Sequence, residues 1–221
     1  GVDHPPEARK QVGALFAQTA PASSFEVIYF EQVERRDFRE ALLEHQQQYP
    51  AGPRFHYGAI PGGSREQLVN AAIAKAEGEI LIFVADDFVV PPGFVEAHLR
   101  LHRVRPELEV VGIGGAVVHY RNQEWFYRWM ERSGELFGVP MDATTDSIPA
   151  NFFYGANASV KRPFLQACGR FDEDFPFDCW DDYELGLRMA RHGLQAVYVP
   201  GALAEHDHAF TLQERCRAMR R

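Results

Sequence analysis

One stretch of the chain combines a helix pattern with a buried strand pattern, at residues 64–87 with the sequence SREQLVNAAIAKAEGEILIFVADD. Ser64 can cap the helix, and Gln67 three residues later completes a capping-box pattern. Gly78 ends the helix, and the apolar run EILIFV predicts a strand buried in a sheet. A helix joined to a strand by so short a turn is typical of a crossover unit in an α/β domain.

Helix and strand patterns alternate along the rest of the chain, which predicts an α/β domain with a mostly parallel central sheet flanked by helices. A length of 221 residues suits a single domain covering residues 1–221. The segment NQEWFYRWMER carries an aromatic stripe at helical spacing, for which packing into the core is favoured over a ligand platform. Further strands are expected at residues 25–30, 55–57, 109–118 and 195–200.

Composition excludes several classes of protein. A hydrophobic fraction of 46% indicates a folded chain, and a net charge of -8 argues against nucleic acid as a partner. No apolar run reaches the roughly 18 residues that a bilayer span requires. Three cysteines without metal-type spacing predict no disulfide framework and a reducing compartment, so we expect a cytoplasmic protein.

Acidic residues follow two of the predicted strands. Glu31 ends one strand, and the pair Asp86-Asp87 ends the EILIFV strand. Ligands of parallel α/β sheets gather at the carboxyl ends of strands. The pair admits three interpretations: a cap for the following turn, ligands for a hard divalent cation such as Mg²⁺ or Mn²⁺, or catalytic acids.

A second acidic cluster, Trp180-Asp181-Asp182-Tyr183-Glu184, opens a predicted helix. Asp181 could be its N-cap and Glu184 the reciprocal capping partner. That interpretation leaves Asp182 unexplained. A carboxylate in a first helical turn is held ionised by the helix dipole, so it can accept a proton if it faces a cleft.

Two histidines, His206 and His208, follow the last predicted strand on an extended segment that puts both rings on one face. Such a pair alone is a weak metal signal. It gains meaning only where the fold brings it to Asp87.

In order and spacing, these three clusters together resemble those of the family 2 glycosyltransferases, which have the GT-A fold and use nucleotide-sugar donors. The resemblance runs from about Pro5 to His208 and is carried by five segments: FEVIYFEQ, PGGSREQLVNAAIAKAEGEILIFVADD, GANASVKRPFLQACGRFDEDFP, WDDYELGLRMARHGL and AEHDHAF. The last four resemble, in turn, the Gly-rich turn with its D-x-D-type strand end, the acceptor-side strand with its G-G-F-D-E turn, the W-E-D-x-D-L helix, and a terminal histidine segment.

The resemblance implies a role for each candidate residue. Asp87 would bind a divalent cation, Mn²⁺ or Mg²⁺, with His206 or His208 completing the metal shell and His206 favoured. Asp86 and Glu31 would contact the donor, a UDP- or GDP-type sugar nucleotide. Asp182 would be the base that deprotonates a glycan or other hydroxyl acceptor, with Trp180 and Asp181 on the acceptor side. The family further implies inversion at the anomeric carbon. Membrane contact is expected to be at most peripheral, at the inner face, through the basic tail ERCRAMRR, for which a solvated helix end is the favoured interpretation.

The chain also departs from the family pattern. Only residues 1–4 precede the first predicted helix, so the first family strand is absent or truncated. Ala85, Val69-Asn70 and Gln32 replace residues that usually contact the donor. These departures support an alternative, a degenerate glycan- or nucleotide-binding domain. A nucleotidyltransferase is disfavoured because no basic, Gly-rich phosphate loop is visible near the N-terminus. The acceptor is expected against the unpatterned region 138–149.

Overall fold

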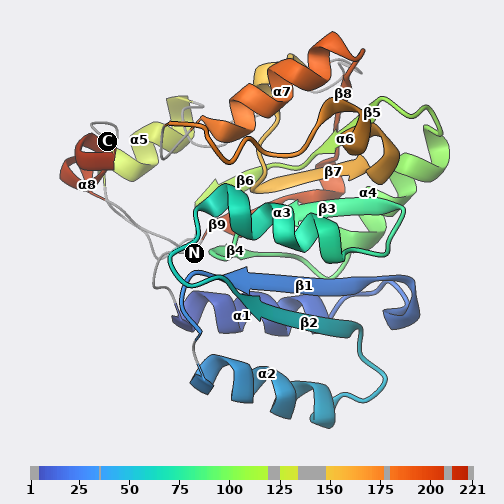
Figure 1. Cartoon of the computed structure of the whole chain (residues 1–221), viewed down its shortest axis with the longest axis vertical. Coiled ribbons are helices and arrows are strands. Elements are labelled where there is room, and N and C mark those ends of the chain that lie inside the picture. The colour runs from blue at the N-terminus through green and yellow to red at the C-terminus, as the bar shows by residue number, and fades with distance from the viewer. Residues whose placement is uncertain are drawn as a thin grey trace.

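The computed structural model describes residues 5–34, 36–118, 125–133, 148–176, 180–206 and 211–218 (Figure 1). His208 and nearly all of the unpatterned region 138–149 lie outside these ranges. The helices are α1 (Pro5–Phe16), α2 (Arg36–Gln48), α3 (Arg65–Lys75), α4 (Phe94–Val104), α5 (Trp125–Ser133), α6 (Arg162–Cys168), α7 (Asp181–Arg191) and α8 (Leu212–Ala218), with 3-10 turns at Ala22–Ser24, Ala150–Phe152 and Pro200–Ala202. The strands are β1 (Glu26–Glu31), β2 (Arg54–Ala59), β3 (Ile80–Val84), β4 (Phe88–Val89), β5 (Val110–Ile113), β6 (Ala116–Val118), β7 (Asn157–Lys161), β8 (Gln195–Tyr198) and β9 (Ala204–His206). None of the described helices is both long and apolar enough to cross a membrane.

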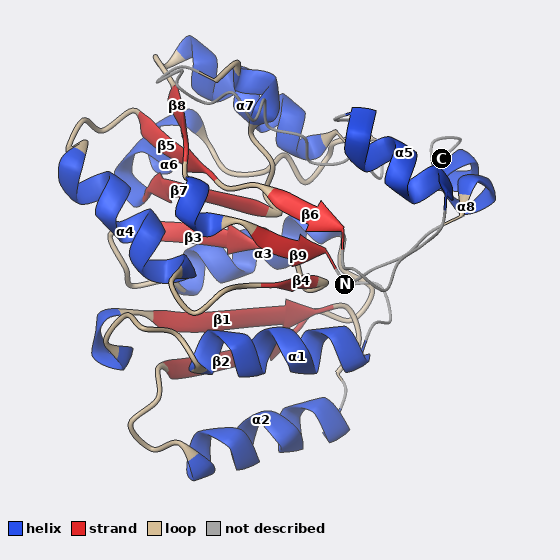
Figure 2. Cartoon of the chain, turned by 180° about the vertical axis from the view of Figure 1, so that it is seen from behind, coloured by secondary structure: helices blue, strands red, loops and turns tan. Residues whose placement is uncertain are grey.

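The strands of the described chain form three sheets (Figure 2). β1 pairs with β2 in parallel, the main sheet has the order β3-β7-β5-β8, and a small sheet has the order β4-β9-β6. Helix α3 lies on the face seen in Figure 1, and α1 and α4 lie on the face seen in Figure 2. The predicted α/β class is confirmed, although the parallel character is partial, because β7 runs antiparallel to both β3 and β5.

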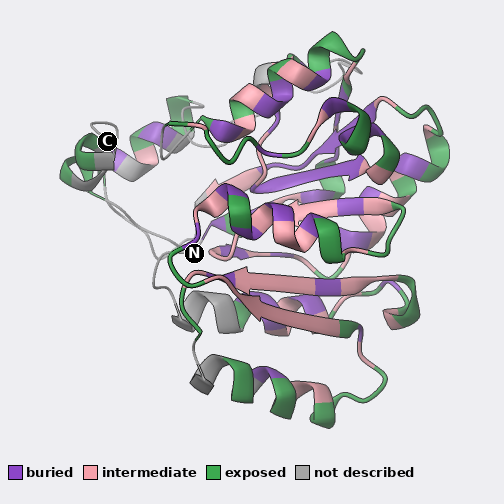
Figure 3. Ribbon diagram, in the orientation of Figure 1, coloured by how far each residue is buried: buried purple, intermediate pink, exposed green. Residues whose placement is uncertain are grey.

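The main core surrounds β7. Four of its five residues are buried, and Figure 3 shows the strand in the colour of buried residues along most of its length. The fully buried side chains around it come from β5, α6, α7 and the segment before β7: Val111, Ile113, Phe153, Leu165, Leu185 and Met189. The EILIFV strand was expected to be buried in the sheet, but only Leu81 of β3 is buried. The difference arises because β3 lies at the end of the main sheet, with a hydrogen-bonded neighbour on one side only.

Several local predictions can be compared with the structure. The capping box of α3 is confirmed: Gln67 N donates to Ser64 Oγ at 3.2 Å, and Ser64 N donates to Gln67 Oε1 at 3.0 Å. The capping box expected at Asp181 is wrong, since the N-cap of α7 is Trp180, with a left-handed φ of 78° and no side-chain capping bond. Glu184 instead accepts from Arg188 Nε at 2.6 Å, one helical turn along.

The aromatic stripe on α5 is only half buried. Phe126 and Met130 pack inward, as expected, whereas Trp125 is 68% exposed and Trp129 is 54% exposed. The strand expected at 109–118 is also interrupted, since β5 and β6 are separated by Gly114-Gly115. A side chain at position 114 would collide with Asn157, which lies against the break.

The described chain begins with α1, and β1 is its first strand. The β1–β2 pair has no hydrogen-bonded ladder to the other described strands. It is joined to them by side chains: Glu26 Oε1 accepts from the backbone N–H groups of Glu77 (2.8 Å) and Gly78 (3.2 Å). The Gln11 amide of α1 donates to the carbonyl of Ala85, directly after β3.

Candidate active site

Asp87 and His206 lie together because two short strands pair. Asp87 directly precedes β4, which runs antiparallel to β9 with Phe88 opposite His206. The Nε2 atom of His206 lies 2.9 Å from Oδ2 of Asp87. The imidazole is buried and the carboxylate is mostly so. The condition under which His206 carries a metal signal, contact with Asp87, is therefore met.

The donor set at this pair suits a divalent cation. A carboxylate oxygen and an imidazole nitrogen are both common ligands of Mn²⁺, and a second carboxylate, Asp86, is adjacent in the chain. Within the described ranges, no group of three or more histidine, cysteine, aspartate or glutamate side chains is arranged around a common metal position.

Asp182 is held by Arg65. The Nη2 atom of Arg65 donates to both carboxylate oxygens of Asp182, at 3.2 and 3.3 Å. The Nη1 atom of the same guanidinium donates to Asp181. Arg65 is the first residue of α3 and the two aspartates open α7, so the two helix starts meet at one cation.

Asp181 differs from its neighbour in burial. Its side chain is 4% exposed, and desolvation raises its pKa to about 6. The Arg65 charge opposes this rise in the pKa of Asp181, while Asp182 and Glu66 add to it. Trp180, the other acceptor-side candidate, is 55% exposed and makes an edge-to-face contact with Tyr183.

The acid pair and Asp182 both lie next to the same short segment, residues 154–157. Ala85 N donates to Ala156 O at 2.9 Å, directly before Asp86 and Asp87. A methyl group added at Gly155 would lie 2.7 Å from Oδ1 of Asp182. The structure thus brings Asp87, His206 and Asp182 to neighbouring positions around the start of β7.

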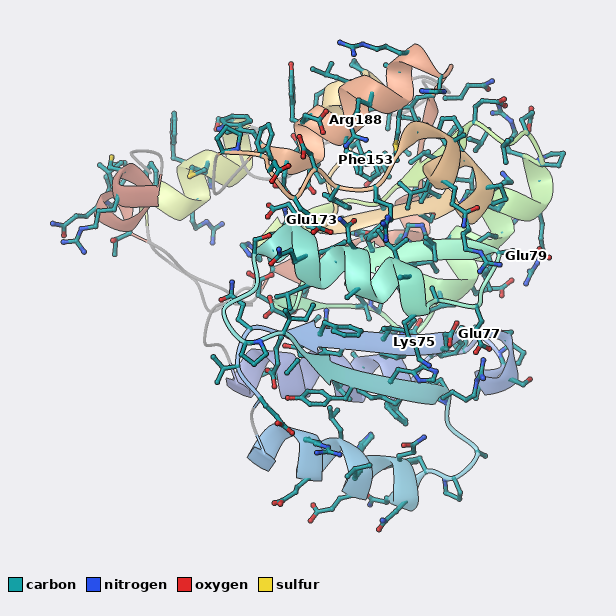
Figure 4. The ribbon with its side chains drawn as sticks, in the orientation of Figure 1. Lys75, Glu77, Glu79, Phe153, Glu173 and Arg188 are labelled. Carbon is teal, nitrogen blue, oxygen red and sulfur yellow. The ribbon has the colours of Figure 1, made fainter. Side chains whose placement is uncertain are left out.

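Asn70 fixes a further part of this region. Its buried amide donates to Phe171 O and to Glu173 Oε1, both at 2.8 Å, and its Oδ1 accepts from Phe171 N at 3.1 Å. In Figure 4 the labelled Glu173 lies beside α3, which carries Asn70. Asn70 therefore ties the turn GRFDED to the helix that presents Arg65.

Glu31 lies at the carboxyl end of β1, as the sequence predicts. Its side chain is buried and accepts a hydrogen bond from the Tyr57 hydroxyl on β2. The neighbouring Gln32 donates to Gly63 O at 2.9 Å, in the turn before α3. A contact between Glu31 and the donor stays a prediction.

A buried network of hydrogen-bonded polar groups lies under the site, and the sequence did not reveal it. Asn157 Nδ2 donates to Gly115 O (2.9 Å) and Ala202 O (2.7 Å), so its Oδ1 accepts from His98 Nε2 at 3.1 Å. Each further group then has one consistent role: Lys161 Nζ donates to His102 Nδ1, His102 Nε2 to Ser159 Oγ, and Ser159 Oγ to His98 Nδ1.

The two histidines of this buried network, His98 and His102, are neutral at physiological pH. Desolvation lowers the pKa of His98 and of His102 to about 4. The nearby Lys161 charge further lowers the pKa of His102. Gly115 and Ala202 precede β6 and β9, so the network fixes the strand that carries His206. In the sequence, His98 and His102 show only helical spacing, and a signal for their partners on β7 is absent.

Comparison with known proteins finds relatives among glycosyltransferases. The family model described as "Glycosyltransferase like family 2" matches residues 4–221. An uncharacterized glycosyltransferase of Bacillus subtilis (strain 168), YfnE, is 25% identical over 168 residues, covering 57% of this chain and 43% of the relative. The O-antigen biosynthesis protein RfbC of Myxococcus xanthus is 29% identical over 216 residues, covering 88% of this chain and 16% of the relative. The chain thus spans less than half the length of either of these curated relatives.

Solved structures show the same fold at low sequence identity. The mannosyltransferase PcManGT from Pyrobaculum calidifontis, in complex with GDP-Man and Mn²⁺, has a TM-score of 0.72 and 17% identity, over 98% of this chain and 57% of that one. S. aureus TarS 1-349 in complex with UDP-GlcNAc has a TM-score of 0.68 and 12% identity, over 92% of this chain and 55% of that one. These likenesses concern the fold, and both neighbours are GT-A glycosyltransferases.

Proposed function

The chain belongs to glycosyltransferase like family 2, and we propose that it moves a sugar from a nucleotide-sugar donor to a hydroxyl acceptor, with Asp182 as the base. The observation that carries this proposal is the meeting of the acid pair and Asp182 at residues 154–157. An inverting transfer needs a proton acceptor on one side of the reacting carbon and charge stabilisation on the other. The two clusters supply these two functions.

Each residue then has a defined task. Asp87 and His206 would hold Mn²⁺ or Mg²⁺, and the cation would supply positive charge for the departing nucleoside diphosphate. Asp86 and Glu31 orient the donor. Asp182 takes the proton of the acceptor hydroxyl while the hydroxyl oxygen forms a bond to the anomeric carbon of the donor. The bond between that carbon and the phosphate oxygen breaks in the same step, and the nucleoside diphosphate leaves. Attack opposite the leaving group inverts the anomeric configuration.

The ligands bound by the structural neighbours support the donor class. GDP-Man with Mn²⁺ is bound by one neighbour and UDP-GlcNAc by another, and both share the fold of this chain. We therefore place a UDP- or GDP-type sugar on the donor side. A glycan acceptor is in keeping with the relative named for O-antigen biosynthesis.

The test is turnover by the purified chain with UDP- and GDP-sugars, glycan acceptors and Mn²⁺. Release of nucleoside diphosphate is measured for wild type, Asp182→Asn and the control Glu107→Gln, which changes an exposed carboxylate before β5. We expect Asp182→Asn to lower kcat by about 10²- to 10⁴-fold, because a positioned base contributes that much. Donor affinity should be retained in this variant. Equal turnover by wild type and Asp182→Asn would remove Asp182 from the mechanism.

A second candidate, a non-catalytic nucleotide- or glycan-binding domain, is favoured by two observations. Ala85 stands at the first acid position of the strand-end motif, and Arg65 contacts both oxygens of Asp182. Calorimetry with nucleoside diphosphates and Mn²⁺ separates the candidates: binding without turnover on any sugar nucleotide supports the binding domain.

A further inference from the structure

Arg65 occupies a position that is electrostatically unfavourable for a cation. It is the first residue of α3, where the helix dipole places partial positive charge. Its location is also fixed, because the Ser64–Gln67 capping box sets the start of the helix. The two carboxylates at the start of α7 compensate: burial by itself lowers the pKa of Arg65, and Asp182 and Asp181 more than reverse this, so the net pKa is raised.

The three charges have different surroundings. Asp181 is buried, whereas the Arg65 side chain is 42% exposed and Asp182 is 17% exposed. One arm of the guanidinium is thus anchored on a buried carboxylate, and the other arm reaches a carboxylate with access to solvent. The Phe171 ring, with its centroid 6.0 Å from Cζ of Arg65, borders the same guanidinium.

Gly155 provides the space for this arrangement. A Cβ at this position would lie 2.7 Å from Oδ1 of Asp182 and 3.5 Å from Nη2 of Arg65. The backbone of Gly155 is not in the left-handed region, which among glycines of the described chain is reached by Gly62, Gly169 and Gly193. Glycine is needed here for room beside the ion pair and not for its backbone freedom.

We propose that Arg65 and Gly155 are positioning residues for Asp182: Arg65, anchored on Asp181, fixes the orientation of the carboxylate, and Gly155 leaves the volume in which that orientation fits. The inference rests on the proposed function, in which Asp182 is the base. Neither residue touches the sugar nucleotide or the acceptor in this role. Both act by holding one carboxylate in the geometry for proton transfer.

If the Arg65 ion pairs only held α3 and α7 together, substitution of Arg65 would have a different effect from the one that a positioning role predicts. Loss of Arg65 as a mere tie would leave the buried Asp181 carboxylate without this partner, which lowers stability, and it would leave the kcat of the folded protein unchanged. A positioning role predicts a loss in kcat, since a misplacement of about 1 Å can cost about a hundredfold in rate. It also predicts that donor KM is preserved, because the Asp87–His206 cluster is untouched.

The experiment compares Arg65→Met, Arg65→Lys and Gly155→Ala with wild type and Asp182→Asn, measuring kcat, donor KM and calorimetric Mn²⁺–nucleotide affinity. We expect Arg65→Met and Gly155→Ala each to lower kcat by about ten- to a hundredfold, with donor KM within about threefold of wild type. Arg65→Lys should recover part of the loss, because an ammonium supplies charge without the bidentate fork. Gly155→Ala is expected to fold, since the clash is with a side-chain oxygen that can rotate away.

Two matched controls are available. Arg103→Met removes an exposed arginine that pairs with Glu96 on α4, and Gly13→Ala adds a methyl group with no atom within 4 Å. Both controls should keep the wild-type kcat. If Arg65→Met and Gly155→Ala also keep it while Asp182→Asn is inactive, the positioning role is overturned and the proposed function stands. If wild type shows no transfer at all, the proposed function and this inference fail together.

Discussion

His206 Nε2 lies 2.9 Å from Asp87 Oδ2, although 119 positions separate the two residues in the chain. The contact depends on the pairing of β4 with β9, in which Phe88 faces His206. The buried network ending at Asn157 holds the start of β9 through Ala202 O. The pair is therefore placed by the fold before any ligand arrives.

Removal of either member of this pair should weaken cation binding. We expect Asp87→Asn and His206→Gln each to lower Mn²⁺ affinity by at least about ten- to a hundredfold, since even groups that only support metal ligands have effects of that size. Isothermal titration calorimetry with Mn²⁺ and a nucleoside diphosphate measures it. Glu205→Gln, on the opposite face of β9, is the control. Unchanged Mn²⁺ affinity in both variants would exclude this pair as the metal site.

Replacement of the α3 cap should lower stability by a modest amount. Ser64→Ala removes the acceptor for Gln67 N, and we expect the free energy of unfolding to fall by about 1 kcal/mol. Urea denaturation measures the change. Ser24→Ala, whose hydroxyl bonds Pro21 O in an exposed turn, should cost less. An equal loss in both variants would contradict a specific capping contribution.

Loss of the Asn157 side chain should be far more damaging. Asn157→Ala leaves the Ala202 carbonyl and His98 Nε2 without their partner, and it leaves the Gly115 carbonyl with the Ala204 N–H alone. Each unsatisfied buried group costs about 1–3 kcal/mol, so we expect a loss of roughly 3 kcal/mol or more. Thermal and urea unfolding measure it, with the surface variant Gln195→Ala as control. A loss below that of Ser64→Ala would show that the network is dispensable.

Mild acid should destabilise the fold through the two buried histidines. Their pKa values are about 4 in the folded protein against an ordinary 6.5, so the unfolded chain binds more protons and stability falls as pH drops from about 6.5 to 4. Asp181 acts in the opposite direction, because its pKa is raised to about 6 and the folded state gains its proton first. Two histidines outweigh one aspartate, and we expect a net loss of roughly 2–3 kcal/mol between about pH 7 and pH 5.

Urea unfolding at several pH values tests this expectation. A His98→Gln variant should be less stable at neutral pH but should show a shallower decline toward pH 5, because one titrating group is gone. His192→Gln, which removes an exposed histidine after α7, should keep the wild-type slope. Identical slopes in all three proteins would show that the buried histidines do not cause the acid sensitivity.

Much of the fold could be predicted from periodicity and capping alone. The helix from Arg65 and the strand at Ile80–Val84 have local signals strong enough to fix their limits within a residue or two. The location of β3 at the end of its sheet could not be predicted, because strand order depends on contacts between residues far apart in the chain. The capping box at Asp181 was wrong for a related reason: Asp181 pairs with Arg65, more than a hundred positions away, instead of with its own helix.

The candidate site shows the same division. Asp87, Asp182 and His206 were candidates because of their types and their places at element ends, and their roles were implied by the family resemblance. Arg65 and Gly155 were not identified, since an arginine at a helix start and a glycine before a strand have many ordinary explanations. Their relation to Asp182 exists only in three dimensions.

Residues 154–157 lie next to both clusters of the candidate site, so a movement of this segment would affect the acid pair and Asp182 together. A shift of Ala156 that opened room beside Asp182 would also pull on Ala85 N and, two residues later, on Asp87. Loops elsewhere can change in sequence to admit a new sugar or acceptor, but the main chain of residues 154–157 tolerates little change. Changes of specificity in such a chain are expected to accumulate around it and to spare it.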